Sequence, residues 1–347
     1  DPEHLVFVLI DGLGSVSLPD LPPGGFLRTH VAMELQTVFP SSTASALTSL
    51  ATGAWPGQHG VTGWWTQLPR LRVAAALLPY TTRPSASGDA VPLMNLGVTS
   101  KEVFLTPSTL NRFVKDAVAV FPREIAQGAY STFFSGGQPR LGYRSTADAV
   151  DMVMDRIGRA ALPSYTYLYF SEVDERAHRL GRRHGRTIHA LRQIDTALGR
   201  LALGVGKTAR VVVTGDHGML DLEPRQHHLL VPGSPLLELL ECPPSGDARV
   251  LFFEVQPGAE DAFRERFLDE YGDVFLLVPV SEAVRLKLFG PGEVRPEVRE
   301  RLGQFVAISR GADVMEFVPV RPDEPPVLVS HHSGLTPQEM MVPLIVA

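Results

Sequence analysis

The strongest structural signal in the chain is residues 5–12, LVFVLIDG, in which an almost continuously apolar run leads directly into an acidic residue and a glycine. A run without polar alternation is typical of a strand that helices cover on both faces of a parallel sheet. Residues 165–170 and 211–213 are further apolar runs, and residues 342–347 form the last one. These four runs are the predicted strands that frame the fold.

Helical patterns lie between the predicted strands. Strands that alternate with helices predict an α/β fold, with a mostly parallel central sheet and helices on both faces. In the helix at 44–51, small hydroxyl residues lead into an Ala- and Leu-rich stretch that Gly53 can terminate. The other predicted helices cover residues 146–161 and 187–203.

Two stretches interrupt this alternation. Residues 64–140 are rich in Pro, Thr and aromatic residues and are interpreted as a cap-like excursion. Residues 228–325 are interpreted as a small α+β insertion. We therefore expect the core domain to consist of residues 1–227 and 326–347. The predicted elements of the insertion are strands at 248–255 and 274–280 and a helix at 259–271.

Length and composition exclude several classes of protein. A chain of 347 residues can form about two domains and bury a core without disulfides, and Cys242 is its single cysteine. The net charge of −6 argues against a nucleic-acid polymer as partner. No apolar run is long enough to predict a membrane span. The printed chain starts at Asp1 without a leader, which favours a cytoplasmic location but leaves open that a leader was removed.

Acidic residues and histidines follow three of the predicted strands. Asp11 comes directly after the first, Asp174 and His178 after the second, and Asp216 and His217 after the third. The carboxyl ends of parallel strands share one edge of a sheet, where ligands bind. We therefore expect these side chains to converge on one site.

Aspartate and histidine in this pattern are suitable zinc ligands. Asp174 and His178 are four residues apart, which places them on one face of a helical turn. His332 lies in the loop before the last strand and can join them, and the adjacent His331 is the alternative at this position. An Asp after a strand is often only a helix N-cap, so the joint occurrence carries the interpretation. The predicted sites hold one ion on Asp11, Asp216 and His217 and a second on Asp174, His178 and His332.

A nucleophile candidate lies in residues 38–53, VFPSSTASALTSLATG. A hydroxyl at a helix N-terminus lies beside free N–H groups that favour a phosphate, and a neighbouring metal would activate it. Taken alone, Ser42 or Thr43 is more simply interpreted as an ordinary N-cap. The predicted metal site is what favours the catalytic interpretation.

The chain resembles the alkaline phosphatase superfamily and, within it, the type I phosphodiesterase/nucleotide pyrophosphatase family. The order and spacing of several motifs follow this family over nearly the whole chain. The matching motifs are IDG at 10–12, FP at 39–40 through TG at 52–53, GQHG at 57–60, Asp174-x-x-x-His178, GDHGM at 215–219 and HSGL at 332–335.

The resemblance implies an alkaline-phosphatase-like fold, two Zn²⁺ ions and a covalent phospho-threonine intermediate. The family's nucleophile lies nine residues before the Thr-Gly that closes its helix, which corresponds to Thr43, itself also a metal ligand. Related phosphonoacetate hydrolases carry a phosphate-contacting Asn where this chain has Trp64. Trp64 and Trp65 as a wall for a base, and Lys101 as a phosphate contact, are the expected substrate-binding residues.

The expected function is hydrolysis of phosphodiester or pyrophosphate bonds in a small nucleotide-like substrate. One alternative is a phosphomonoesterase or phosphonate hydrolase on the same two-metal core, and the replacement of the Asn by Trp64 counts against the phosphonate case. An alternative of another class is a catalytically silent, metal-stabilised binding domain. The presence of all six ligand positions and the hydroxyl disfavours it, because a protein that has lost catalysis should have lost at least one.

Overall fold

The computed structural model describes residues 2–85, 88–113, 116–319 and 328–347. Contacts between residues divide the chain into two compact units, each assembled from segments far apart in the sequence. The first unit comprises Asp1–Thr37, Ser108–Leu220 and Pro337–Ala347. The second unit comprises Val38–Pro107 and Asp221–Thr336.

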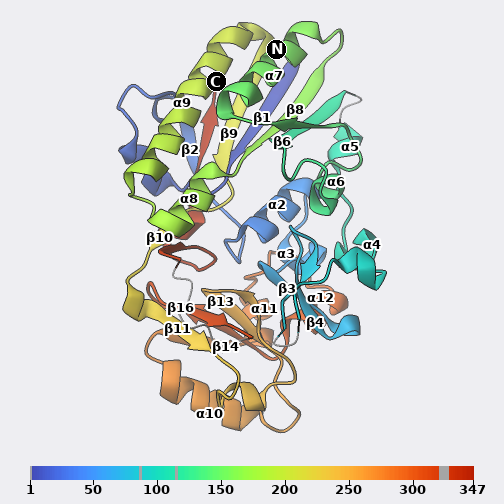
Figure 1. Ribbon diagram of the computed structural model, residues 1–347, viewed down its shortest axis with the longest axis vertical. Helices are drawn as coiled ribbons and strands as arrows, with labels where there is room; N and C mark the ends of the chain where they lie inside the picture. Colours follow the sequence, from blue (N-terminus) through green and yellow to red (C-terminus); the bar gives the residue numbers. More distant parts are fainter. Residues whose placement is uncertain (1, 86–87, 114–115, 320–327) are drawn as a thin grey trace. The chain divides into compact units, whose positions relative to one another are not determined.

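The first unit is built on a seven-stranded sheet in the order β2-β18-β9-β1-β8-β6-β7 (Figure 1). The pairs that join β9, β1, β8, β6 and β7 are all parallel, whereas β18 is antiparallel to both of its neighbours. Because β18 runs the other way, it begins at the edge where the parallel strands end. The strands are β1 (His4–Ile10), β2 (Val31–Gln36), β6 (Ala117–Pro122), β7 (Arg140–Tyr143), β8 (Ser164–Phe170), β9 (Ala209–Gly215) and β18 (Met341–Val346).

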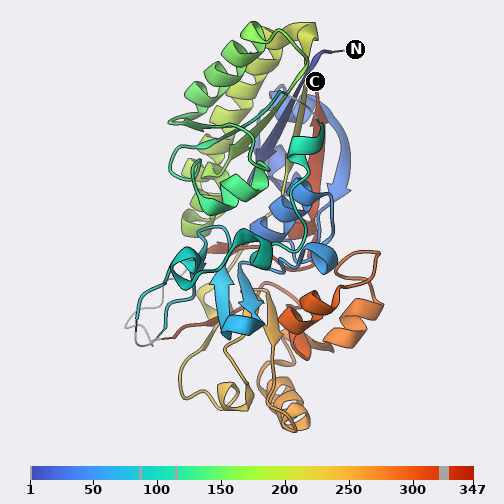
Figure 2. The same cartoon turned by 90° about the vertical axis from the view of Figure 1, so that its right-hand side faces the viewer.

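Helices cover both faces of this sheet. Val6 and Val8 of β1 pack into a buried apolar cluster with the long helices α7 and α9, which lie together on one side of the sheet in Figure 2. On the opposite face, Phe7 stacks with Tyr167 of β8, and Tyr167 contacts Phe134 of α6 at a ring distance of 4.5 Å. The helices are α1 (Phe26–Thr29), α5 (Leu110–Phe113), α6 (Ala129–Phe134), α7 (Thr146–Arg159), α8 (Glu172–Leu180), α9 (Gly185–Val205) and α13 (Pro337–Met340).

The second unit contains its own seven-stranded sheet, in the order β14-β15-β13-β12-β3-β4-β5, with antiparallel neighbours throughout. Strands β11 and β16 form a separate parallel pair. The strands are β3 (Trp65–Leu68), β4 (Val73–Ala76), β5 (Thr81–Thr82), β11 (His227–Leu230), β12 (Ser245–Asp247), β13 (Val250–Phe253), β14 (Phe275–Pro279), β15 (Phe305–Ser309), β16 (Val314–Phe317) and β17 (Ser330–His331). Strand β10 (Leu220–Asp221) lies where the chain passes from the first unit to the second.

Alternate residues of β13 build two separate cores in the second unit. Val250 and Phe252 join one apolar cluster, and Leu251 and Phe253 join the other. The period of two is that of a strand covered on both faces. The helices of this unit are α2 (Thr43–Thr52), α3 (Pro56–His59), α4 (Ser100–Val103), α10 (Glu260–Tyr271), α11 (Val280–Arg285) and α12 (Pro296–Leu302).

The structure confirms the predicted α/β class, the four framing strands and the helices that begin near residues 44, 146 and 187. Gly53 ends α2 with a φ of 66°, as expected of a helix C-cap glycine. The expected domains, a core of residues 1–227 and 326–347 and an insertion at 228–325, stay a prediction, and the contact-based units group residues 38–107 with residues 221–336. Strands β3–β5 extend the sheet that contains the predicted insertion, whereas β6 pairs with β8 in the first unit.

Candidate active site

Three buried side chains meet at the carboxyl ends of β1 and β9. The two strands are parallel neighbours with Ile10 opposite Gly215, so the residues that follow, Asp11 and Asp216, come side by side. With His217 they are at most 3% exposed, and a candidate ligand atom from each lies within 4.8 Å of the others. The His217 Nε2 atom is 3.4 Å from Asp11 Oδ1 and 3.5 Å from Asp216 Oδ2. The expected convergence of these two strand ends is therefore observed.

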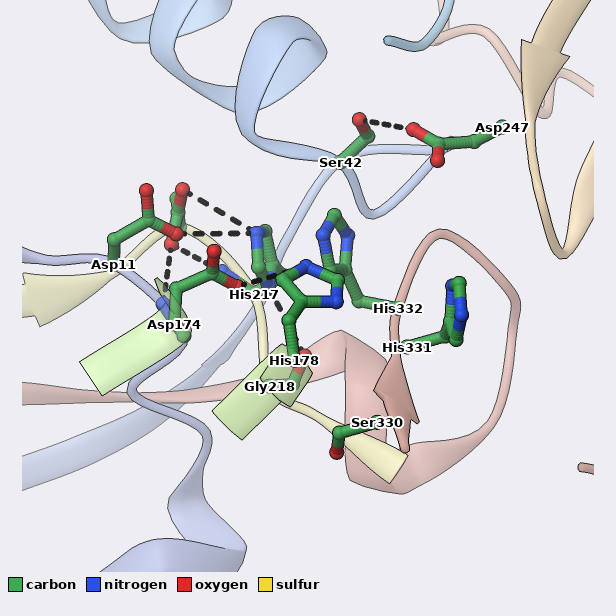
Figure 3. Close-up of polar contacts among 12 residues, drawn as sticks. Asp11, Ser42, Asp174, His178, His217, Gly218, Asp247, Ser330, His331 and His332 are labelled. Carbon is green, nitrogen blue, oxygen red and sulfur yellow. Dashed lines mark hydrogen bonds and ion pairs between the residues drawn. The ribbon is translucent and has the colours of Figure 1, made fainter. Parts of the chain in front are cut away.

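Hydrogen bonds fix the orientation of this cluster. Oδ1 of Asp216 accepts the backbone N–H groups of Gly12 (3.1 Å) and His217 (3.0 Å). Nδ1 of His217 lies 3.0 Å from the Gly218 carbonyl oxygen, and because a carbonyl can only accept, Nδ1 carries the proton. Nε2 of His217 is thereby directed at the carboxyl oxygens, as Figure 3 shows for Asp11. A histidine that binds a metal through one ring nitrogen usually donates the N–H of its other ring nitrogen to a carbonyl or carboxylate oxygen.

The electrostatics of the cluster also fit a cation. Burial raises the pKa of the Asp11 carboxyl well above its usual range, and repulsion from Asp216 adds to the shift. Burial likewise raises the pKa of Asp216, which His217 opposes. Among the described residues, none donates a hydrogen bond to Asp216 Oδ2. A bound metal ion would offset the cost of burying these two carboxylates.

Asp174 and His178 lie on α8, directly after β8. Their side chains face one another across a turn of the helix, with His178 Nε2 3.4 Å from Asp174 Oδ1 (Figure 3). Gly12 brings this helix close to the first cluster, because a Cβ atom on Gly12 would lie 3.2 Å from Asp174 Cα. Its φ of 74° is the left-handed conformation that favours glycine. The structure thus brings the acidic ends of β1, β8 and β9 to one edge of the first unit's sheet.

The predicted nucleophile and the last predicted ligand lie in the second unit. Thr43 is the first residue of α2 and is 6% exposed. His332 is buried, with Nδ1 3.0 Å from the Ser41 carbonyl oxygen, two residues before Thr43. His331 instead has Nε2 4.0 Å from Glu316 Oε1 and its ring 5.9 Å from that of His227. His332, rather than His331, is therefore the histidine beside the start of α2.

The expected substrate-binding residues have different surroundings within the second unit. The Trp64 side chain is exposed, and its backbone N–H donates to Asp247 Oδ2 at 3.0 Å. The Arg83 guanidinium lies 4.5 Å from the centre of the Trp65 ring, so Trp65 already has a partner on one face. Lys101 is exposed on the short helix α4.

Sequence reasoning missed two residues that contact the site. The Tyr169 hydroxyl donates to Asp11 Oδ2, and Asp247 accepts the Ser42 hydroxyl at 2.6 Å. The apolar run at residues 165–170 marks Tyr169 only as part of a buried strand. Asp247 is separated from Ser42 by about two hundred residues, so no local pattern signals their contact.

The fold and the strand-end residues define a class of protein. Residues 5–241 match the family described as type I phosphodiesterase/nucleotide pyrophosphatase, which is more than half of the chain. The chain belongs to this family. None of the helices in the described part of the chain is both long and apolar enough to cross a membrane.

Individual relatives agree with this assignment. Venom phosphodiesterase 2 of Crotalus adamanteus and venom phosphodiesterase CdcPDE of Crotalus durissus collilineatus are each 24% identical over 201 residues, which is 56% of this chain and 23% of each relative. The chain thus spans about a quarter of the length of these relatives.

Two solved structures share the fold. Murine ectonucleotide pyrophosphatase/phosphodiesterase 5 superposes with a TM-score of 0.69 at 16% identity, covering 98% of this chain and 87% of that one. Phosphonoacetate hydrolase of Sinorhizobium meliloti, in complex with phosphonoformate, gives a TM-score of 0.65 at 17% identity, covering 99% and 90%. The alkaline-phosphatase-like fold expected from the sequence is confirmed.

Proposed function

We propose that this protein is a metal-dependent hydrolase that cleaves phosphodiester or pyrophosphate bonds in small nucleotide-like substrates. The observation that carries the proposal is the buried cluster of Asp11, Asp216 and His217 at the ends of β1 and β9. A structural role alone does not account for two buried carboxyls facing a histidine nitrogen at 3.4 and 3.5 Å. Membership of a phosphodiesterase/pyrophosphatase family supplies the reaction class.

The site would take two Zn²⁺ ions. Asp11, Asp216 and His217 would hold one, with Thr43 as its further ligand, and Asp174, His178 and His332 would hold the other. Carboxylate oxygens and imidazole nitrogens are the donor set of catalytic zinc. When bound, the ions would stabilise charge on the phosphoryl oxygens and activate a hydroxyl or water as nucleophile.

The course of the chain supports the inclusion of Thr43 and His332. Thr37, the last residue before the chain enters the second unit, donates its hydroxyl to the Asp216 carbonyl oxygen, and Thr43 follows six residues later. The Gly218 N–H donates to the Glu339 carbonyl oxygen at 2.8 Å, and His332 precedes Glu339 by seven residues. Both residues are therefore a few positions along the chain from backbone that is hydrogen-bonded to the segment after β9.

In the proposed mechanism, Thr43 Oγ1 attacks the phosphorus atom. The Thr43 hydroxyl proton passes to solvent, the bond to the leaving group breaks, the leaving group departs with the electron pair of that bond, and a phosphate diester forms on Thr43. Water then attacks the same phosphorus, releases the monoester product and restores the threonine hydroxyl. Backbone N–H groups in the first turn of α2 are suited to hold the non-bridging oxygens.

A nucleotide is the favoured substrate class, with a diester preferred over a monoester. The inactive form of murine ectonucleotide pyrophosphatase/phosphodiesterase 5 has been solved with AMP. In this chain the exposed indole of Trp64 offers an aromatic surface near Ser42, since both residues bind Asp247. An aromatic surface suits a base better than a bare phosphate oxygen.

Steady-state kinetics with zinc test the proposal. A nucleoside nitrophenyl phosphodiester and nitrophenyl phosphate share a leaving group, so their kcat/KM values compare diester and monoester directly. We expect zinc-dependent turnover that is faster for the diester. Absence of zinc-dependent turnover of either ester would contradict the proposed function, and equal or faster monoester turnover would contradict the diester preference alone.

A further inference from the structure

The hydroxyl of Ser42 is turned away from the helix that it begins. Ser42 is the N-cap residue of α2, but its side chain caps no backbone N–H of that helix. Instead, its Oγ donates to Asp247 Oδ2 at 2.6 Å, as the dashed line in Figure 3 shows. An N-cap serine usually accepts from the second or third helical N–H. The Ser42 hydroxyl is therefore engaged by Asp247 instead of capping α2.

The Asp247 carboxylate is itself held in place by several donors. Oδ2 also accepts the Trp64 N–H at 3.0 Å, and Oδ1 accepts the Ala248 N–H at 3.2 Å. Hydrogen bonds from N–H and O–H donors stabilise the charged form of a carboxyl group. The next basic residue along the chain, Arg249 in the turn between β12 and β13, donates from its guanidinium to the carbonyl oxygens of Gly311 and Asp313.

The acidic group of Asp247 is thus hydrogen-bonded to the residue directly before the proposed nucleophile, Thr43. A phosphate under attack must come within about 3.5 Å of Thr43 Oγ1. The Asp247 carboxylate contacts the hydroxyl of Ser42, the residue that directly precedes Thr43. A diester phosphate carries one negative charge near pH 7, whereas a monoester carries up to two. Repulsion by a nearby carboxylate therefore disfavours the monoester more strongly.

We propose that Asp247 is a specificity-determining residue that selects against a second negative charge on the phosphate. It favours a diester substrate and also favours release of the monoester product. This inference rests on the proposed function, since it assumes that the phosphate binds at Thr43. It does not depend on a change in metal binding, because Asp247 is not among the proposed ligands.

The test compares Asp247→Asn with the wild-type protein on the two nitrophenyl esters. We expect the ratio of kcat/KM for the diester to kcat/KM for the monoester to fall about tenfold. Asp247→Glu keeps the charge and should retain most of the wild-type ratio. Asp261→Asn, an exposed residue of α10, makes the same change in net charge and should leave the ratio unchanged.

A binding measurement gives a readout that does not require turnover. In a Thr43→Ala background, calorimetry with inorganic phosphate should show about tenfold tighter binding when Asp247→Asn is added. An unchanged ratio together with unchanged phosphate affinity would overturn the proposal. So would an equal loss of activity on both esters with unchanged phosphate affinity, which indicates a purely structural role. If the wild-type protein cleaves neither ester, the proposed function fails, and the phosphate measurement still decides the role of Asp247.

Discussion

The backbone N–H of Gly12 donates a 3.1 Å hydrogen bond to Oδ1 of Asp216, which ties the loop after β1 to the loop after β9. Oδ1 is thereby committed to backbone donors, and Oδ2 faces Nε2 of His217. The backbone thus decides which oxygen of Asp216 is presented to the centre of the cluster. Four predictions concern this cluster, the start of α2, the pair His331 and His332, and the buried His59.

Replacement of Gly12 should damage both stability and metal binding. Gly12→Ala places a Cβ atom at a φ of 74°, only 3.2 Å from Asp174 Cα, and we expect a loss of about 1–3 kcal/mol in the free energy of unfolding. Zinc affinity should also fall, because Asp174 must shift. Gly53→Ala is the matched control, with a φ of 66° and open space around the added atom. Urea unfolding and zinc titration that show the same effect for both variants would contradict the assigned role of Gly12.

Removal of the Thr43 hydroxyl should abolish catalysis without unfolding the protein. We expect Thr43→Ala to lose nearly all turnover, since no other group would form the covalent intermediate, and Thr43→Ser to retain part of it. Circular dichroism should show an unchanged fold. Elemental analysis should find at least one zinc ion per chain, which is the ion expected on Asp174, His178 and His332. Near-normal turnover in Thr43→Ala, with loss of turnover in Ser41→Ala or Ser42→Ala, would show that a neighbouring serine is the nucleophile instead of Thr43.

The two adjacent histidines should differ in their effect on metal content. His332→Ala should lower the bound zinc by about one ion per chain, because the second site loses a ligand. His331→Ala should keep the wild-type content, since its ring lies beside Glu316 and His227. Elemental analysis of both purified variants makes the comparison. Loss of zinc in His331→Ala alone would reverse the assignment.

His59 should make the protein sensitive to acid. The residue is fully buried between Ser49 Oγ, 2.9 Å from Nε2, and the Val61 N–H, 3.1 Å from Nδ1. Burial, together with the nearby Arg301, lowers its pKa from 6.5 to about 3. The folded state thus favours the neutral ring, and the stabilisation is present above pH 6.5 and is lost as the pH falls from there towards about 3.

The corresponding experiment compares His59→Gln with the wild-type protein. The variant should show a shallower decrease in the free energy of unfolding between about pH 6.5 and pH 4.5, where each unit of pH contributes at most about 1.4 kcal/mol per group. His189→Gln, an exposed residue of α9, serves as control and should keep the wild-type dependence. An identical pH dependence in all three proteins would contradict the lowered pKa.

The sequence was sufficient for the parts of the fold that have a local signature. The apolar runs at 5–10, 165–170 and 211–213 mark strands of the first unit's sheet, and the acidic residues after them mark the sheet edge. Strand β4, Val73–Ala76, has small side chains without alternation and lies in a stretch of Pro, Thr and aromatic residues. Its place in the second unit's sheet depends on pairing with β3 and β5, which no local pattern reveals.

The candidate site was predictable to the same extent. Asp11, Asp174 and Asp216 each follow a strand, so the parallel arrangement alone predicts their convergence. The choice of Thr43 among neighbouring hydroxyls needed the resemblance to a family. The contacts of Ser42 and Trp64 with Asp247 join residues far apart in sequence, so no local pattern indicates them.

The central claim is that the three acidic strand ends and His332 form a two-zinc centre. The most direct measurement is a crystal structure of the zinc-loaded protein with anomalous data collected at the zinc edge. The account predicts two anomalous peaks, one bound by Asp11, Asp216 and His217 and the other by Asp174, His178 and His332. A single peak, no peak among these residues, or ligation by His331 in place of His332 would contradict it.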